Sequence, residues 1–275
     1  MRIAFVAAVL AALSINVAGA SADSYVALGD SYAAGPIIPL QIRPYGCLKS
    51  DHNYAHLAAP QLNPLTLRDP SCSGAETDDM TQTQGVSPGP NPPEFDSLDA
   101  GTKLVSLQIG GNDIGFSSIA EGCFNTSPNG PPCRDKYVSG GDDQVSDRIA
   151  ATAPKVAAVI QGIHERSPDA KVLVFNYPAI FPDTGPGCWP TLPVANADVA
   201  WLRDKEKELN QMLADQAAAN GATMVDWYRA SIGHDACKLP VIRWVEPLVP
   251  ASPAAPVHPN LVGMLAASKL VVANR

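Results

Sequence analysis

Short apolar segments that run into glycine or proline recur along the chain. The clearest cover residues 24–28, 104–109, 171–177 and 222–227, and a weaker one covers 65–68. Apolar runs of this length, bounded by turn residues, are typical of strands that are buried on both faces. The pattern therefore predicts these segments as the strands of a parallel sheet.

Three segments with helical spacing alternate with the strands. The first is expected to open at Pro154, the second covers 195–219 and the third runs from Leu261 to Leu270. Proline is well placed in the first turn of a helix, where its missing N–H is not needed. Alternation of strands and helices predicts an α/β protein with helices on both faces of the sheet. Ligands of such proteins bind at the carboxyl ends of the strands.

Three further stretches, 85–101, 122–141 and 238–259, are rich in Pro, Gly, Ser or Asp and are predicted to be loops. The last could be a linker between domains. It leads, however, directly to His258-Pro259-Asn260 at the start of a predicted helix. Because long loops in compact domains are often functional, we interpret it as a loop over a cleft.

Composition narrows the possible partners. Hydrophobic residues make up 46% of the 275 positions, which is enough to build a core and excludes disorder of the whole chain. The 19 Lys and Arg residues against 27 Asp and Glu residues give a net charge of −8. We therefore expect no nucleic-acid partner and no polybasic docking to anionic membranes.

The first residues have the features of a secretory signal peptide. Met1 and Arg2 precede an apolar run, and the segment ends in Ala20-Ser21-Ala22. The alternative is an uncleaved membrane anchor, but the run is shorter than the roughly 20 apolar residues that an anchor needs. We predict a secreted protein, cleaved after Ala22, with a single domain over 23–275 and no stable membrane anchor.

Six cysteines follow this segment. They are Cys47, Cys72, Cys123, Cys133, Cys188 and Cys237. An even number in an oxidising compartment indicates three disulfides, although the count alone does not choose among the possible pairings. Zinc is the other interpretation, but the spacing of the cysteines contains no CxxC. We expect no metal site.

Candidate catalytic residues lie where predicted strands end. Ser31 follows the first strand through Gly29-Asp30, and Asn112 follows Gly110-Gly111 after a second strand. A serine is a weak nucleophile unless a base takes its proton, and His258 is the candidate base. The Asn112 side chain and the Gly74 backbone N–H are candidate donors to an oxyanion. Each residue alone has a structural explanation, as a helix cap or a turn residue.

Taken together and in order, four blocks of sequence resemble the SGNH (GDSL) hydrolase family. The blocks are Gly29-Asp30-Ser31-Tyr32, Ser73-Gly74-Ala75, Gly110-Gly111-Asn112-Asp113 and His258-Pro259-Asn260. The chain is most similar to the branch of secreted actinobacterial esterases, lipases and phospholipases, whose members carry six cysteines.

The resemblance has several implications. It implies a three-layer α/β/α, flavodoxin-like fold with a five-stranded parallel sheet. It also implies that Ser31 is the nucleophile, that His258 is its base, and that Ser31 N–H, Gly74 N–H and the Asn112 side chain form the oxyanion hole. No cofactor is expected. In this branch the disulfides pair in sequence order, which gives Cys47–Cys72, Cys123–Cys133 and Cys188–Cys237.

One position departs from the family pattern. The family usually has an aspartate three residues before the histidine, which orients the imidazole, but this chain has Ala255 there. We hypothesise that the Ala255 carbonyl accepts the His258 Nδ1–H instead. A distant acid, Glu246 or Asp235, is the alternative.

These observations predict a secreted, monomeric serine carboxylester hydrolase, an esterase or lipase that acts on a small-molecule or lipid ester. The segment 36–40 (PIIPL) is predicted to line an acyl pocket. Two alternatives stay open. One is an exported, non-catalytic module that binds lipids or acylated glycans. The other is a phospholipase or polysaccharide deacetylase with the same chemistry.

Overall fold

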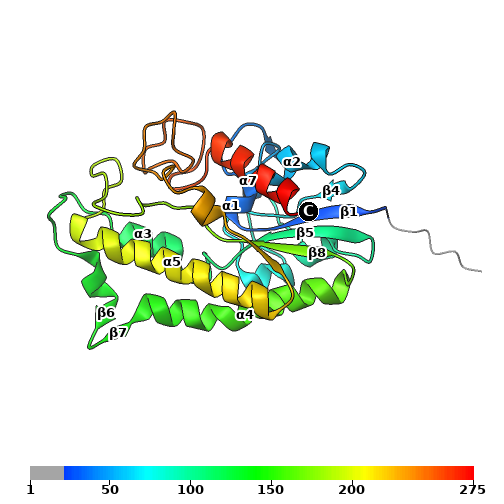
Figure 1. Ribbon diagram of the computed structural model, residues 1–275, viewed down its shortest axis with the longest axis horizontal. Coiled ribbons are helices and arrows are strands. Elements are labelled where there is room, and N and C mark those ends of the chain that lie inside the picture. Colours follow the sequence, from blue (N-terminus) through cyan, green and yellow to red (C-terminus); the bar gives the residue numbers. More distant parts are fainter. Residues whose placement is uncertain (1–21) are drawn as a thin grey trace, which may run out of the picture.

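The computed structural model describes residues 22–275 and is built around one five-stranded sheet (Figure 1). In spatial order the strands are β4 (Thr66–Arg68), β1 (Ser24–Gly29), β5 (Thr102–Gln108), β8 (Lys171–Phe175) and β9 (Thr223–Val225). All neighbouring pairs are parallel. Numbered along the chain, the order is 2-1-3-4-5, which is the flavodoxin-like order. The predicted fold class is confirmed. The predicted signal peptide, 1–22, lies outside the described residues except for Ala22.

Helices cover both faces of the sheet (Figure 1). The helices α2 (Tyr54–Ala58) and α7 (Leu261–Ala273) contact each other on one face, and α4 (Gln144–Arg166) and α5 (Asn196–Ala219) contact each other on the opposite face. Three shorter helices are α1 (Ser31–Ala34), α3 (Phe116–Gly122) and α6 (Trp227–Ala230).

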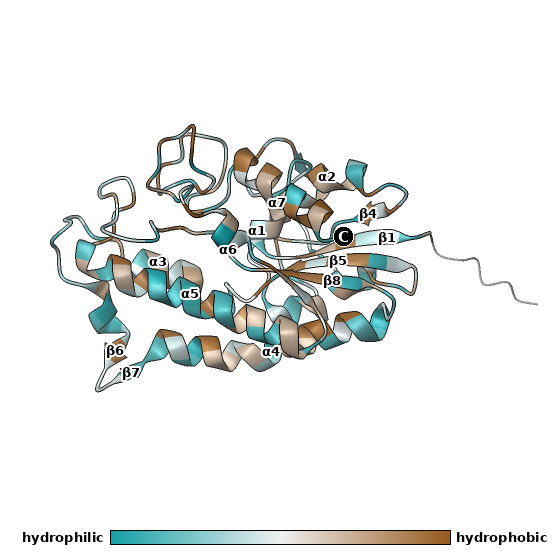
Figure 2. Cartoon of the chain, in the orientation of Figure 1, coloured by the Kyte–Doolittle hydropathy of each residue, from teal (hydrophilic) through white to brown (hydrophobic). Residues whose placement is uncertain are grey.

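The central strand β1 shows why the sheet needs two covering layers. Every residue of β1 is buried. Val26 and Leu28 belong to the core beneath α4 and α5, whereas Tyr25 and Ala27 belong to the core beneath α2 and α7. Side chains alternate across a strand, so a strand with apolar residues on both of its faces must be covered on both sides. In Figure 2 β8 is largely brown, and brown and teal bands alternate along α4 and α5.

The first long helix does not begin where the sequence predicts. Pro154 lies inside α4 and not in its first turn. The helix begins after Asp143, whose Oδ1 accepts hydrogen bonds from the Val145 and Ser146 N–H groups at 3.0 and 3.3 Å. Pro154 cannot donate to the Ala150 carbonyl, but both residues are exposed, so water can satisfy that carbonyl. The other two predicted helices are confirmed as α5 and α7.

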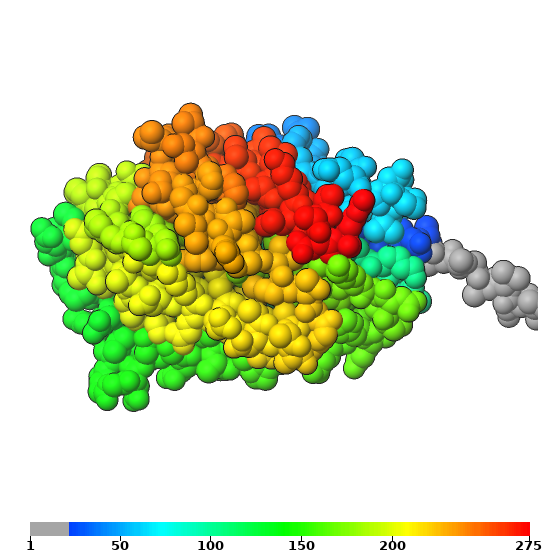
Figure 3. All heavy atoms as spheres, in the orientation of Figure 1, coloured from blue at the N-terminus to red at the C-terminus, as the bar shows by residue number. Residues whose placement is uncertain are grey.

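Short elements occupy the loops. Two hairpins pair β2 (Gln41–Ile42) with β3 (Lys49–Ser50) and β6 (Val138–Ser139) with β7 (Asp142–Asp143). Single 3₁₀ turns cover Tyr45–Cys47, Ala59–Gln61, Thr77–Met80, Glu94–Ser97 and Cys133–Lys136. The stretch 238–259 contains no helix or strand, as predicted, and leads into α7. In Figure 3 this orange stretch and the red α7 lie side by side on one face of the molecule.

Three disulfides join loops around the carboxyl edge of the sheet. They are Cys47–Cys72, Cys123–Cys133 and Cys188–Cys237, the pairing that the resemblance implies. The first closes a segment of 25 residues, the second one of 10 and the third one of 49. Within residues 22–275 no helix has the length and apolar character needed to cross a membrane.

Candidate active site

The first strand delivers Ser31 to the carboxyl edge of the sheet. Gly29 ends β1 with φ +138°, and a Cβ atom there would lie 2.2 Å from the Gln108 carbonyl oxygen of β5. Only glycine allows this close approach of the two strands. Asp30 then caps α1, because its Oδ1 accepts from the Tyr32 N–H at 2.9 Å. Ser31 is consequently held at the first position of the helix.

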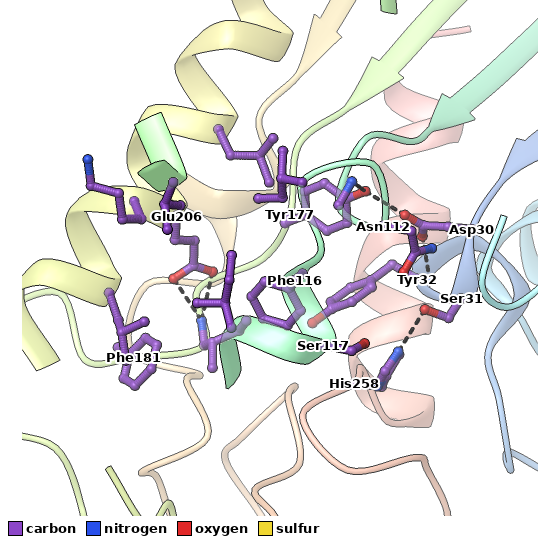
Figure 4. A pocket seen from close by; sticks show the side chains of 18 residues that line it. Asp30, Ser31, Tyr32, Asn112, Phe116, Ser117, Tyr177, Phe181, Glu206 and His258 are labelled. Carbon is purple, nitrogen blue, oxygen red and sulfur yellow. Dashed lines mark hydrogen bonds between the residues drawn. The ribbon is translucent and has the colours of Figure 1, made fainter. Parts of the chain in front are cut away.

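His258 reaches Ser31 from the opposite end of the chain. Its Nε2 lies 2.7 Å from Ser31 Oγ (Figure 4). Its Nδ1 lies 2.7 Å from the carbonyl oxygen of Pro256. A carbonyl only accepts, so Nδ1 carries the hydrogen and Nε2 keeps a lone pair for the Ser31 hydroxyl hydrogen. Burial lowers the pKa of His258 below its ordinary value of 6.5, although the Pro256 carbonyl opposes this shift. The imidazole is therefore neutral at neutral pH, the form that acts as a base.

The predicted acceptor of the His258 Nδ1–H, the Ala255 carbonyl, is wrong, because the acceptor is the carbonyl of the next residue, Pro256. The Ala255 carbonyl accepts the backbone N–H of His258 at 3.2 Å, which closes a turn. Within this turn Val257 has φ +62°, which directs the imidazole toward the carbonyl of Pro256. The acceptor of the His258 Nδ1–H therefore lies two residues before the histidine and not three.

Neither candidate carboxylate takes the aspartate's place. Glu246 is buried and accepts from Arg243 at 2.6 Å, Asn260 at 2.8 Å and the Ala251 N–H at 2.8 Å. Asp235 caps the turn at Cys237. Among the described residues, no carboxylate is hydrogen-bonded to His258.

Two loops carry the remaining candidate oxyanion donors, Asn112 and Gly74. Asn112 lies in the same pocket as Ser31 and His258, and its Nδ2 donates to the Ala75 carbonyl at 2.9 Å. That bond uses one of two amide hydrogens and leaves the other for a ligand. Across residues 22–275, the Ser31 and Gly74 N–H groups have no hydrogen-bond acceptor. All three groups are thus available donors.

The Gly74 loop is fixed from several sides. Gly74 has φ +83°, a conformation that favours glycine. The preceding Cys72 donates its N–H to Gly29 of β1 at 2.9 Å and is bonded to Cys47. The following Ala75 is held by Asn112. The disulfide, the strand and Asn112 therefore place Gly74 in relation to Ser31.

A network that the sequence analysis did not assign lies beneath the nucleophile. Tyr177, at the end of β8, donates its hydroxyl hydrogen to Asp30 Oδ2 at 2.5 Å and accepts from the Gly111 N–H at 2.8 Å. Burial raises the pKa of Asp30 from 3.8 to about 7, although the bonds from Tyr177 and Tyr32 lower it. The position of Tyr177 at a strand's carboxyl end is the signal that points to it in the sequence.

The pocket beside Ser31 is mainly apolar (Figure 4). Its apolar walls come from α3, from the loop after β8 and from α5, and they include Phe116, Ile119, Ile180, Phe181, Leu202 and Leu209. The segment 36–40 contributes nothing to these walls. Ile37 and Leu40 are exposed, and Ile38 packs into the core beneath α2 and α7. The predicted acyl pocket in 36–40 is therefore wrong.

A parallel flavodoxin-like sheet, with a serine and a histidine meeting at the carboxyl ends of its strands, defines the SGNH class of α/β hydrolases. Residues 27–266 match the GDSL-like Lipase/Acylhydrolase family, and the chain belongs to this family. It is therefore a carboxylic ester hydrolase, as predicted.

Relatives and solved structures agree with this assignment. The chain is 39% identical to Lipase 2 of Streptomyces coelicolor, over 87% of this chain and 81% of that protein. It is 32% identical to Lipase 1 of the same organism, over 79% and 74%. In fold it is similar to phospholipase A1 from Streptomyces albidoflavus, with a TM-score of 0.77 and 24% identity over 93% of this chain and all of that one. An extracellular lipase from Streptomyces rimosus gives a TM-score of 0.76 and 24% identity over 92% and 100%.

Proposed function

We propose that this hydrolase uses Ser31 as its nucleophile and His258 as its only general base. The observation that carries the proposal is the 2.7 Å contact between Ser31 Oγ and a His258 Nε2 whose tautomer is set by Pro256. A nucleophile and base within hydrogen-bond reach, with the base oriented by a third group, is the arrangement that activates a serine.

The reaction follows from this geometry. Ser31 Oγ attacks the ester carbonyl carbon while its proton moves to His258 Nε2. The negative charge that develops on the carbonyl oxygen is stabilised by the Ser31 N–H, the Gly74 N–H and the Asn112 Nδ2–H. His258 then gives its proton to the leaving alcohol oxygen as the C–O bond breaks. Water, deprotonated by the same imidazole, hydrolyses the acyl-enzyme.

The backbone acceptor has a chemical consequence. Pro256 orients the imidazole as an aspartate would, but a neutral carbonyl stabilises the imidazolium less than a carboxylate does. The proposed enzyme therefore works with a Ser–His dyad.

The competing functions differ in how well they fit the site. A non-catalytic binding module has no need for a histidine hydrogen-bonded to a serine, so the contact between Ser31 and His258 favours catalysis. A phospholipase or a deacetylase would use the same residues. The apolar walls next to Ser31 favour a substrate with an apolar acyl group over an acetylated polysaccharide.

We further propose that the protein is secreted as a monomer with one hydrolase domain over 23–275. The signal-like segment 1–22, the three disulfides and the extracellular lipase among the structural neighbours support export.

The test combines turnover and covalent labelling. Ser31→Ala is expected to abolish hydrolysis of p-nitrophenyl esters and labelling by a serine-directed organophosphonate, with an unchanged circular dichroism spectrum. Ser139→Ala, an exposed serine in β6, is the matched control and should retain both. Undiminished turnover in Ser31→Ala would disprove the proposal, and absence of labelling and turnover in the unaltered protein would favour the binding module.

A further inference from the structure

The three candidate oxyanion donors lie on three segments that are far apart in the sequence. Ser31 follows β1, Gly74 lies in the loop after β4, and Asn112 follows β5. A donor stabilises an oxyanion only when it lies about 2.7–3.1 Å from the position that the oxygen takes in the transition state. The distances among the three segments must therefore be closely fixed.

Backbone hydrogen bonds fix these segments only up to the edge of the sheet. The last such bond between the segments of β1 and β5 runs from the Asp30 N–H to the Gln108 carbonyl at 2.9 Å. Within residues 22–275, no backbone–backbone hydrogen bond joins 110–114 to 31–34 or to 73–77. Beyond the strands, the connections among the three segments are therefore made by side chains.

We propose that two side chains, the Tyr177 hydroxyl and the Asp113 carboxylate, set the distances among the oxyanion donors and so act as positioning residues. Tyr177 connects the Ser31 segment to the Asn112 segment, and Asp113 connects the Asn112 segment to the Gly74 segment. The inference rests on the proposed function, because it needs an oxyanion beside Ser31. It goes further by giving a part in the reaction to two residues that are neither nucleophile, base nor donor.

The Tyr177 hydroxyl is hydrogen-bonded on both sides. It donates to Asp30 Oδ2 at 2.5 Å (Figure 4), and it accepts from the Gly111 N–H at 2.8 Å. Burial raises the pKa of Tyr177, so the hydroxyl keeps the hydrogen that it donates. The other carboxyl oxygen of Asp30 accepts from the Tyr32 N–H at the start of α1, and Gly111 directly precedes Asn112. One hydroxyl thus links α1 to the residue beside Asn112.

Tyr177 is itself held in a fixed place. The Asn210 side chain of α5 accepts from the Tyr177 N–H at 2.9 Å and donates to the Tyr177 carbonyl at 3.0 Å. The Tyr177 ring meets the Tyr32 ring edge to face, with 5.0 Å between the centroids. At Gly111 a Cβ atom would lie 2.8 Å from the Tyr177 hydroxyl oxygen, so only glycine leaves room for this hydrogen bond. A tyrosine fixed at its backbone and its ring can hold two segments at a set distance.

The Asp113 carboxylate makes the second connection. Its Oδ1 accepts from Thr77 Oγ1 at 2.5 Å, and its Oδ2 accepts from the Thr77 N–H at 3.1 Å. The side chain of Asp113 is completely buried. The neighbouring Asn112 adds a bond from its Nδ2 to the Ala75 carbonyl at 2.9 Å. Two adjacent residues of one segment therefore hold the loop that contains Gly74.

Tyr177→Phe removes only the hydroxyl and tests the first connection. We expect kcat for p-nitrophenyl butyrate to fall about tenfold, because the Ser31 and Asn112 segments can then shift relative to each other. KM should change by less than about twofold, since the carbonyl oxygen of the bound ester carries less charge than the oxyanion. The matched control is Tyr25→Phe, which removes a buried hydroxyl bonded to Ser106 Oγ at 2.8 Å in the core beneath α2 and α7. This control should retain the kcat of the unaltered enzyme.

A double-mutant cycle separates positioning from a general loss of structure. If Tyr177 acts by placing the Asn112 donor, removal of that donor should also remove most of the effect of the hydroxyl. In the Asn112→Ala background we therefore expect Tyr177→Phe to lower kcat by no more than about threefold. The same fold loss of kcat in both backgrounds would show that the two residues act independently, and it would overturn the positioning role of Tyr177.

Thr77→Val tests the second connection and leaves Tyr177 unaltered. Valine has the shape of threonine but cannot donate, so Asp113 keeps only its bond from the backbone N–H. We expect kcat to fall about threefold with KM unchanged, because the Gly74 loop is held less firmly. The matched control is Thr102→Val, which alters a buried hydroxyl at the amino end of β5, where it accepts from Ser24 Oγ at 3.3 Å. Should Tyr177→Phe fail to fold, Thr77→Val and its control still decide the proposal.

The outcomes distinguish this inference from the proposed function. An unaltered protein that hydrolyses no p-nitrophenyl ester contradicts the proposed function. An active enzyme in which Tyr177→Phe or Thr77→Val has the same kcat as its control overturns only the positioning role of the residue concerned. A rise in KM at unchanged kcat also overturns that role, because the side chain would then contribute to substrate binding.

Discussion

Tyr32 donates its hydroxyl hydrogen to the carbonyl oxygen of Val257 over 2.7 Å, and so connects the residue after the nucleophile to the residue before the base. The Tyr32 ring also lies 4.8 Å from the His258 ring, centroid to centroid. Val257 has φ +62°, an unfavourable conformation for a β-branched residue. The hydrogen bond from Tyr32 stabilises this backbone conformation, and the conformation orients the His258 ring toward Ser31.

Replacing Tyr32 by phenylalanine should therefore lower activity without removing any proposed catalytic group. The ring stays in place, but the Val257 carbonyl loses its donor, at a cost of about 1 kcal/mol of stability. We expect kcat to fall about tenfold with little change in KM, because the imidazole is less well oriented. Tyr45→Phe, which alters an exposed tyrosine of a 3₁₀ turn, is the control. Equal kcat values for the two variants would show that Tyr32 has no positioning role.

Asn112 should stabilise the transition state more than it stabilises the bound substrate. In Asn112→Ala the oxyanion loses one donor, which typically lowers kcat about 10²–10³-fold. KM should change little, because the ground-state carbonyl oxygen carries less charge. The exposed Asn129→Ala is the matched control. Steady-state kinetics on p-nitrophenyl butyrate measure kcat and KM for the two variants. A rise in KM at unchanged kcat in Asn112→Ala would assign Asn112 to substrate binding instead.

The pH dependence of activity should reflect His258. The base must be neutral, so kcat/KM rises with pH as the imidazolium loses its proton. Burial lowers the pKa of His258, and no carboxylate among the described residues counteracts it through a hydrogen bond. The midpoint of this acidic limb should therefore lie below 6.5. A midpoint above 6.5 would indicate that a carboxylate stabilises the imidazolium, contrary to the dyad.

Asp30 should make the pH dependence of stability unusual. In the unfolded chain an aspartate loses its proton near 3.8, but in the folded protein burial raises the pKa of Asp30 to about 7. Between these values the folded state holds one more proton than the unfolded state. Its contribution to the free energy of unfolding therefore falls as pH rises through this window, with a slope of up to about 1.4 kcal/mol per pH unit, and is constant above it.

Urea unfolding across this window tests the contribution of Asp30. The difference in unfolding free energy between the unaltered protein and Asp30→Asn should change with pH from 3.8 to about 7 and then level off. Asp142→Asn, an exposed carboxylate of β7, removes the same charge as a control. A difference that is independent of pH would mean that Asp30 ionises like an ordinary aspartate.

The parts of the site that could be predicted from sequence are those fixed by the ends of strands. Ser31 and Asn112 follow neighbouring parallel strands, so they had to lie at one edge. The acceptor of His258 Nδ1 could not be predicted in this way, because it depends on the positive φ of Val257, a residue type that rarely adopts it.

Long-range packing limited the other expectations. The bond between Tyr177 and Asp30 joins residues 147 positions apart, and no local pattern specifies it. Which residues line the pocket likewise depends on how α3 and α5 pack over the sheet. The apolar character of the segment 36–40 was therefore not enough to place it in the pocket wall. The α4 helix begins at Gln144 and not at Pro154, because Asp143 caps its first turn and is a stronger N-terminal signal than the proline.

The Cys47–Cys72 disulfide should matter for activity as well as for stability. It closes a 25-residue segment, so replacing both cysteines by alanine should lower the free energy of unfolding by about 3.5 kcal/mol. The same change at Cys123–Cys133, with a separation of 10, should cost about 2.7 kcal/mol. Only the first bond adjoins Gly74, where Ser73 donates its N–H to the Cys47 carbonyl at 3.0 Å. We therefore expect kcat to fall several-fold further in the first variant than in the second, measured at a temperature where urea titrations show both to be folded. Equal kcat values would mean that Gly29 and Asn112 suffice to hold the Gly74 loop.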